Sequence, residues 1–206
     1  MEIKTFFHYT MYLQLIHLMI MNTNFYKTYY DEYFRLIFSD DLEHKFEDFK
    51  DLAIETKNSK SKLIFGGNGA SASISAHGAV DFTKQAGVRS ITFNEANIIT
   101  CFSNDYGYDN WIAKALEFYA NEGDVVVLTS VSGESPSVVL AAKKAKEMGL
   151  KVVTFSGRSS RNTLKSNGDI NFWVDSNAYN IVECIHMMWL TTVIDSVIGK
   201  SEYEVS

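Results

Sequence analysis

Two turns rich in small polar residues carry the side chains that could bind a phosphate group. The first turn spans residues 66–71 (Gly-Gly-Asn-Gly-Ala-Ser), and the second spans residues 130–135 (Ser-Val-Ser-Gly-Glu-Ser). At the start of a helix the first backbone N–H groups have no internal partner, and the helix dipole favours negative charge, so anions bind there. Glycine lets the backbone approach a ligand, and serine hydroxyls donate hydrogen bonds without adding charge. We therefore expect the two turns to form one phosphate pocket.

Ser135 is followed by Pro136, an order that is also typical of a helix cap with proline at the first helical position. A cap needs one hydroxyl, whereas serines stand at positions 130, 132 and 135, so we favour phosphate binding. The first turn also fits a degenerate dinucleotide fingerprint. The acidic residue that this fingerprint requires about twenty positions later has no match, because Glu95 lies farther along. No nucleotide cofactor is expected.

Two pairs of ionisable residues could carry proton or metal chemistry. His77 and Asp81 are four residues apart, so they share one face of a helix. They could hold a divalent metal, one could orient the other as a base, or they could form an ordinary helical pair. Glu183 lies within the apolar segment 181–190, where a carboxylate should be paired or bound, so we select it as a functional residue. His186 is either a second functional group or a satisfied core histidine.

The elements that must position these residues alternate between strands and helices. Short apolar runs predict strands, and apolar residues near every third or fourth position predict helices. The predicted strands are 63–65, 89–93, 125–129, 151–155 and 170–174, and the predicted helices are 71–84, 98–102, 111–120, 136–148 and 180–198. This alternation predicts an α/β fold, a doubly wound parallel sheet flanked by helices, with ligands outside the carboxyl ends of the strands.

Ahead of the sheet we expect an N-terminal helical extension over residues 1–54, with two helices separated near residues 39–41. The sheet domain then covers residues 55–206. The apolar segment 6–21 is too short and too polar to span a bilayer, and it lacks the features of a signal peptide. Two interpretations of it stay open: an apolar helix that packs on a partner subunit, or an upstream start whose true beginning is Met21.

The composition excludes several classes of protein. With 206 residues, 46% of them hydrophobic and 21% charged, the chain lies near globular averages. A net charge of −6 offers no basic surface for nucleic acid, so no direct nucleic-acid partner and no membrane are expected. Cys101 and Cys184 show no metal-type spacing, which indicates reduced thiols and a cytoplasmic protein.

Five motifs converge on one family. In chain order they are the glycine-rich turn, His77 with Asp81, residues 104–108 (Asn-Asp-Tyr-Gly-Tyr), the serine-rich turn, and Glu183 with His186. This set resembles the sedoheptulose-7-phosphate isomerase (phosphoheptose isomerase) family of the SIS, or sugar isomerase, fold, from about Asp31 to Ile198. The resemblance implies a flavodoxin-like three-layer sandwich, a homotetramer with active sites at subunit contacts, and often a zinc ion. It also implies isomerisation of an aldose and a ketose phosphate in heptose supply for lipopolysaccharide or another surface polysaccharide.

The resemblance further implies roles for individual residues. The substrate contacts would be Asn68, Gly69, Ser71, Asn104, Asp105, Ser130, Ser132 and Ser135. The zinc ligands would be His77, Asp81 and Glu183, with Asp81 as the base. Thr191 stands where the family has a catalytic histidine, and threonine cannot act as a general acid near neutral pH. We expect His186, or a water, to return the proton in its place.

These departures leave two functions open. An isomerase would hold the phosphate at the serine-rich turn and abstract a proton beside the sugar carbonyl. The alternative is a non-catalytic SIS protein that binds a sugar phosphate or regulates a partner, as a family relative that binds the bacterial replication initiator does. The loss of the histidine at Thr191 favours the alternative, whereas His77 and the acids Asp81 and Glu183 favour the enzyme. We favour the isomerase.

Overall fold

The computed structural model describes residues 24–38 and 41–202 of the chain, which divides into two compact units. The first unit reaches Phe38 and holds a helix over residues 24–37. The second begins at Ser39, earlier than the boundary expected after residue 54. The difference arises because α2 (Leu42–Asn58) packs into the second unit through Phe49, which is fully buried there. The expectations for residues 6–21 lie outside the described part of the chain.

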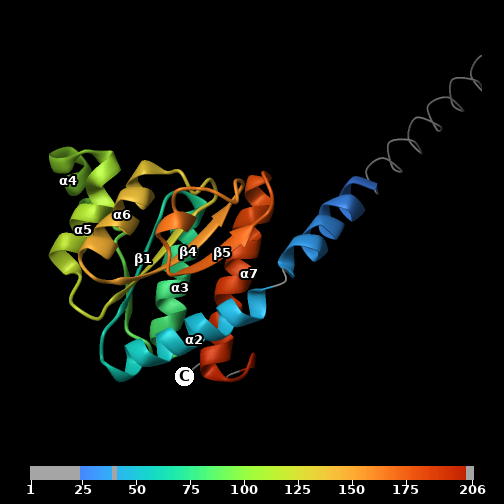
Figure 1. The fold of residues 1–206 in the computed structure, drawn as a ribbon, viewed down its shortest axis with the longest axis horizontal. Coiled ribbons are helices and arrows are strands. Elements are labelled where there is room, and N and C mark those ends of the chain that lie inside the picture. The colour runs from blue at the N-terminus through green and yellow to red at the C-terminus, as the bar shows by residue number, and fades with distance from the viewer. Residues whose placement is uncertain (1–23, 39–40, 203–206) are drawn as a thin grey trace, which may run out of the picture. The chain divides into compact units, whose positions relative to one another are not determined.

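Five parallel strands form one sheet in the order β2-β1-β3-β4-β5 (Figure 1). Their bounds are Leu63–Gly67 for β1, Ser90–Thr92 for β2, Val125–Ser130 for β3, Lys151–Gly157 for β4 and Ile170–Val174 for β5. The chain winds outward from β1 in both directions, which is the flavodoxin-like order with its switch point between β1 and β3. The predicted doubly wound parallel sheet is confirmed.

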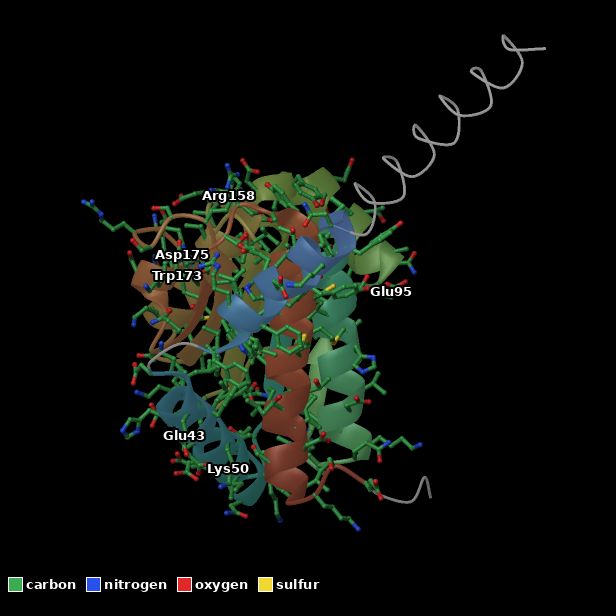
Figure 2. All side chains as sticks on the ribbon, turned by 90° about the vertical axis from the view of Figure 1, so that its right-hand side faces the viewer. Glu43, Lys50, Glu95, Arg158, Trp173 and Asp175 are labelled. Atoms are coloured by element: carbon green, nitrogen blue, oxygen red, sulfur yellow. The ribbon has the colours of Figure 1, made fainter. Side chains whose placement is uncertain are left out.

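Helices cover both faces of this sheet (Figures 1 and 2). One face is covered by α2, α3 (Ala70–Lys84) and α7 (Tyr179–Ile198). The other face is covered by α4 (Ala96–Tyr106), α5 (Trp111–Tyr119) and α6 (Pro136–Glu147). Short 3-10 turns occupy Tyr108–Asn110 (η1) and Lys165–Asn167 (η2). Helices α3 and α7 lie side by side, since a Cβ on Gly78 would come within 2.6 Å of Leu190.

Among the described residues, α7 is the helix whose length and apolar composition would allow it to cross a membrane, and 44% of that stretch is buried inside the molecule. Its buried side chains include Val182, Ile185 and Trp189, all 1% exposed or less. Partial burial of this kind is expected of a core helix that also presents an apolar outer face.

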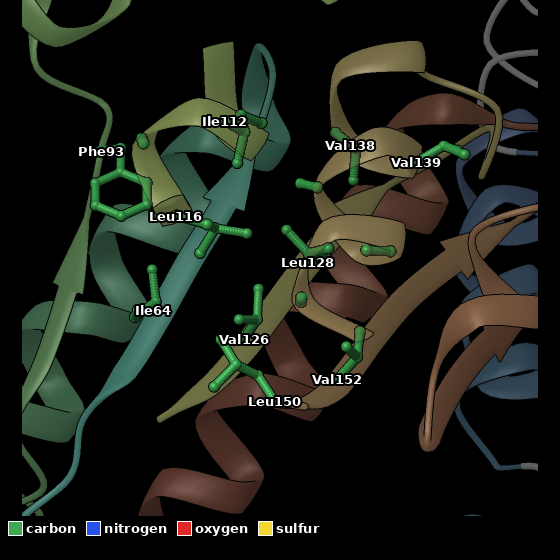
Figure 3. Close-up of a cluster of buried hydrophobic side chains, with 14 of the residues drawn as sticks. Ile64, Phe93, Ile112, Leu116, Val126, Leu128, Val138, Val139, Leu150 and Val152 are labelled. Carbon is green, nitrogen blue, oxygen red and sulfur yellow. The ribbon is translucent and has the colours of Figure 1, made fainter. Parts of the chain in front are cut away.

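The hydrophobic core has two parts because consecutive strand residues point to opposite faces of a sheet. Figure 3 shows the part beneath α5 and α6, where Ile64, Val126 and Leu128 of the strands meet Leu116 and Val138. The other part is aromatic and lies beneath α2, α3 and α7; its members include Phe49, Phe65, Phe82, Phe155, Phe172 and Trp189. Both faces therefore hold the strands rigidly, and with them the turns at their carboxyl ends.

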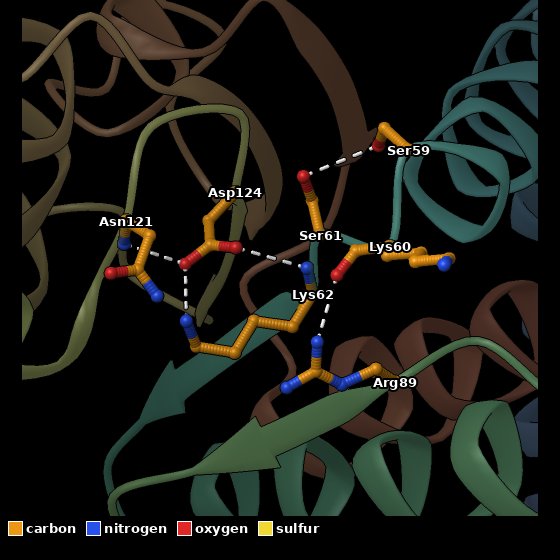
Figure 4. A network of polar contacts seen from close by, with 7 residues as sticks. All are labelled: Ser59, Lys60, Ser61, Lys62, Arg89, Asn121 and Asp124. Atoms are coloured by element: carbon orange, nitrogen blue, oxygen red, sulfur yellow. Dashed lines mark hydrogen bonds and ion pairs between the residues drawn. The ribbon is translucent and has the colours of Figure 1, made fainter.

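A buried ion pair fixes β1 against β3 at their amino ends (Figure 4). The Lys62 ammonium contacts the Asp124 carboxylate, and the Lys62 backbone N–H donates to the same group over 2.9 Å. Asp124 also accepts the backbone N–H of Asn121 over 2.7 Å. A buried carboxylate is tolerated when it is paired and hydrogen-bonded in this way. The pair sets the register of the two strands whose far ends carry the predicted phosphate turns.

Candidate active site

A pocket of about 160 Å³ opens at the carboxyl ends of β1 and β3, where the strand order reverses. This is the position at which doubly wound sheets bind ligands. Both predicted turns contribute to it, together with the start of α7. Its lining residues are Asn68, Ser71, Thr129, Ser130, Val131, Ser132, Ser135, Val138, Tyr179 and Glu183.

Asn68 connects the two turns. Its side-chain amide donates to the hydroxyls of Ser135 and Ser137, each over 2.9 Å. Its side-chain oxygen accepts a hydrogen bond from the Tyr108 hydroxyl over 3.1 Å. The first turn, the second turn and η1 therefore meet at one side chain, which holds the Ser135 hydroxyl at the pocket.

The serine-rich turn is held from behind by the loop that follows β4. Gly133 has a φ of +66°, and a Cβ at this position would lie 2.1 Å from Asn162. The Gly133 carbonyl accepts the N–H of Leu164 over 2.9 Å, and the Glu134 carboxylate accepts the hydroxyl of Thr163 over 2.7 Å. Within the turn, Ser130 and Ser132 place their hydroxyl oxygens 3.4 Å apart. These contacts fix the backbone of the turn that carries the serine hydroxyls.

Three helices begin at this pocket. Ser71 is the second residue of α3, Ser135 precedes the first residue of α6, and Tyr179 is the first residue of α7. The Ser135 side chain makes no cap hydrogen bond to α6, so capping does not account for it. The three helix dipoles and unpaired N–H groups favour an anion in the pocket. None of the ten lining residues is Lys or Arg.

Glu183 supplies the one carboxylate among the lining residues. It lies in the second turn of α7 and is half-buried. Asp81, the expected base, does not line the pocket, and its carboxylate lies 3.0 Å from the Nε2 of His77 on α3. Burial and the nearby Asp81 carboxylate raise the pKa of Asp195, which places Asp81 beside the far half of α7. Glu183 and Asp81, the two acids of the predicted site, are therefore separated along the helices.

The expected zinc ligands do not come together within one chain. Across residues 24–38 and 41–202, no three His, Cys, Asp or Glu side chains are grouped so that they could hold a metal ion. His77 and Asp81 offer two ligands, and Glu183 faces the pocket. A catalytic zinc site needs three protein ligands, so the described residues of a single chain do not fit this metal.

His186 lies in the core, away from the pocket lining. It is fully buried, and its Nε2 lies 3.0 Å from the carbonyl oxygen of Ser156. Burial lowers the pKa of His186 to about 4, against a weaker opposing effect of that hydrogen bond. The Thr191 hydroxyl donates to the carbonyls of Met187 and Met188 in its own helix. Neither side chain is placed to give a proton to a ligand in this pocket.

The segment around η1 contacts a lining residue of the pocket through Tyr108, a residue for which no individual role was expected. Asn104 and Asp105, the expected substrate contacts, are exposed and hydrogen-bonded to each other over 2.9 Å, outside the pocket. Gly69 is exposed at the start of α3 and also lies outside the lining. Tyr108 instead contacts Asn68. Its place in the same motif was the available signal, as its hydroxyl is a ready hydrogen-bond donor.

Comparisons with known proteins agree with this geometry. Residues 28–157 match the family model of the SIS domain. The phosphoheptose isomerase of Fusobacterium nucleatum is 33% identical over 141 residues, 66% of this chain and 72% of that protein. A probable phosphoheptose isomerase of Thermoplasma volcanium is 34% identical over 76% of this chain and 83% of that protein. The solved structure of a phosphoheptose isomerase from Francisella tularensis has the same fold, with a TM-score of 0.78 at 19% identity over 88% of this chain and 98% of that one.

Proposed function

Since the chain belongs to the phosphoheptose isomerase family of SIS domains, we propose that it interconverts the aldose and ketose forms of a sugar phosphate of the sedoheptulose 7-phosphate class. The observation that carries this proposal is the pocket, where serine hydroxyls and three helix N-termini surround space for a phosphate and Glu183 adds a carboxylate. The curated relatives are named as isomerases, which favours catalysis over the non-catalytic alternative.

The phosphate binds at the serine-rich turn. Ser130, Ser132 and Ser135 donate their hydroxyls, and Asn68 and Ser71 support it from the first turn. The helix N-termini stabilise the negative charge that serine hydroxyls alone would leave uncompensated. Anchoring the phosphate in this way fixes the position of the sugar carbons relative to the carboxylate, which is how binding energy is used for orientation.

We assign the role of base to Glu183, the carboxylate among the lining residues of the pocket. In aldose–ketose isomerisation a base removes the proton from the carbon next to the carbonyl, and a proton is then added to the former carbonyl carbon. A hydroxyl proton also moves from the oxygen of the first carbon to the oxygen of the second. His186 has no part in this scheme, and no step passes through zinc.

Asp81 enters only if the substrate extends beyond the pocket. It lies ten residues after Ser71 on α3, about 15 Å along a helix that rises 1.5 Å per residue. A sugar chain that leaves the pocket along α3 would approach His77 and Asp81 at the outer face of the helix. We assign this pair to the part of the site that a second copy of the chain would complete.

A homotetramer accounts for the apolar outer face of α3 and α7. Val80 on α3 is 61% exposed and Met188 on α7 is 41% exposed, and Cys184 on α7 is exposed as well. Exposed apolar residues that gather on one face indicate a protein contact.

Two free thiols, Cys101 and Cys184, favour the reducing cytoplasm. Heptose supply for lipopolysaccharide or a related polysaccharide is the setting that the family suggests.

The test is proton-to-deuterium exchange by NMR in heavy water, with a panel of aldose and ketose phosphates that includes sedoheptulose 7-phosphate. Exchange at the carbon beside the carbonyl detects proton abstraction even when the return step fails. Glu183→Gln should lower the exchange rate at least a hundredfold, since a positioned base contributes about 10²–10⁴. Glu122→Gln, at an exposed acid in the turn before β3, is the control and should leave the rate unchanged.

Two outcomes would contradict the proposal. If exchange survives in Glu183→Gln but is lost in Asp81→Asn, the base is Asp81, as the family resemblance implies, and not Glu183. If no sugar phosphate exchanges although calorimetry detects its binding, the non-catalytic alternative holds.

A further inference from the structure

The pocket has an unusual charge balance for a phosphate site. Its ten lining residues include a carboxylate, Glu183, and no Lys or Arg. A sugar phosphate carries a charge of about −1.5 to −2 near pH 7, since its second ionisation has a pKa near 6. Helix N-termini offset part of this charge, each with roughly half a unit. The site would bind its ligand more strongly with a cation at its edge.

Arg158 provides a cation in contact with a lining residue. Its guanidinium carbon lies 5.9 Å from the centre of the Tyr179 ring, and Tyr179 lines the pocket. Arg158 follows directly after β4, and Figure 2 labels it on the loop outside the strand ends. The preceding residue, Gly157, donates its N–H to the carbonyl of Val131, another lining residue, over 2.9 Å.

The backbone of Arg158 is held in place although its conformation is unfavourable. Its φ is +56°, in the left-handed region that non-glycine residues rarely adopt. Its N–H donates to the carbonyl of Ser176 over 3.0 Å, which ties the loop after β4 to the segment before α7. This conformation fixes where the side chain leaves the backbone, next to the first residue of α7.

The guanidinium itself is lightly held. Its Nε donates to the Asn177 side-chain oxygen over a long 3.4 Å, and within the described residues no carboxylate pairs with it. The residue is exposed. An arginine that stacks on an aromatic ring and has no acidic partner keeps its N–H groups available for an anion.

We propose that Arg158 is a specificity-determining residue that binds the phosphate of the substrate from the mouth of the pocket, beside the serine-rich turn. The inference rests on the proposed function and adds a cation to it. The planar guanidinium donates two parallel N–H groups to two phosphate oxygens, a geometry that lysine cannot reproduce. The Tyr179 ring, 5.9 Å from the guanidinium carbon, holds the Arg158 side chain beside the pocket.

Other cations nearby are less suited to this role. Lys165 lies with its ammonium 4.7 Å from the centre of the Trp173 ring on β5, and burial lowers its pKa. Arg161 belongs to the same loop as Arg158 and is exposed, but no lining residue is among the contacts observed for it. Arg161 is therefore the matched control, because its removal changes the charge of the loop by the same amount.

The experiment measures inorganic phosphate binding by calorimetry and steady-state kinetics with the exchanging sugar phosphate. Arg158→Gln should weaken phosphate binding and raise KM about tenfold or more, with a smaller change in kcat, because a hydrogen-bonded ion pair is lost. Arg158→Lys should recover part of the affinity. Arg161→Gln should change both constants less than twofold, and higher salt should weaken the wild type more than Arg158→Gln.

Two results overturn the inference, and they are distinguishable. If Arg158→Gln and Arg161→Gln have equal effects on phosphate binding, Arg158 contributes only to the general charge of the loop and the inference alone fails. If the folded wild-type protein binds no phosphate, the proposed function fails and the inference fails with it.

Discussion

The side chain of Asn68 donates to the hydroxyl of Ser135 over 2.9 Å, across a separation of 67 residues in sequence. The bond spans the switch point of the sheet, from the end of β1 to the start of α6. It makes one pocket from two turns that each follow a different strand. The geometry of the phosphate site therefore depends on an amide that need not touch the sugar.

Replacing Asn68 should weaken phosphate binding while the fold is kept. Asn68→Ala removes the donor to Ser135 and Ser137 and the acceptor for Tyr108, so we expect an affinity loss of roughly tenfold for these neutral hydrogen bonds. Asn68→Asp should lose more, because it adds a carboxylate beside the anion. Calorimetry with inorganic phosphate measures both. Asn97→Asp, an equal change on exposed α4, is the control, and an equal loss there would contradict the prediction.

The serine-rich turn should tolerate no side chain at Gly133. Gly133→Ala combines a left-handed backbone with a Cβ 2.1 Å from buried Asn162, so it should cost about 2–4 kcal/mol of stability and weaken phosphate binding. Gly149→Ala is a matched variant, as Gly149 has a φ of +73° with nothing within 4 Å of an added Cβ. It should cost about 1 kcal/mol, from backbone strain alone. Urea unfolding compares the two, and equal losses would show that Asn162 moves aside.

The core histidine should make stability depend on pH. Burial lowers the pKa of His186 to about 4, from 6.5 in the unfolded chain, so below pH 6.5 the unfolded chain binds a proton that the folded chain does not. His186 therefore contributes about 3 kcal/mol to the free energy of unfolding above pH 6.5, and this contribution is lost as the pH falls toward 4. Urea unfolding at pH 7.5 and pH 5 measures it. His186→Gln should reduce the difference between the two pH values, and an unchanged difference would assign it to other groups.

The sequence predicted the sheet and both turns because these depend on local patterns. Apolar runs that end in glycine or serine identified β1 and β3, and their parallel pairing followed from the alternation with helices. The acids and histidines were harder to place. A spacing of four residues shows that two side chains share a helix face, but it does not show which part of the protein that face contacts. His77 and Asp81 do share a face, yet neither lines the pocket, and His186 turns into the core toward Ser156. Arg158 had no local signal, because its contact with Tyr179 joins a loop to a helix 21 residues later.

The last prediction concerns the outer face of α3 and α7. If this face is the contact between copies, a charge placed on it must be buried without a partner, and that cost prevents assembly. Val80→Asp and Met188→Asp, at residues 61% and 41% exposed, should therefore yield smaller species than the wild type by light scattering coupled to size exclusion. Phe118→Asp is the control, since Phe118 is 63% exposed on α5 at the opposite face of the sheet and should leave the mass unchanged. Because both substituted side chains are exposed within one chain, circular dichroism should show an intact fold. A wild type that is itself monomeric, or aspartate variants that keep its mass, would show that this face has another use.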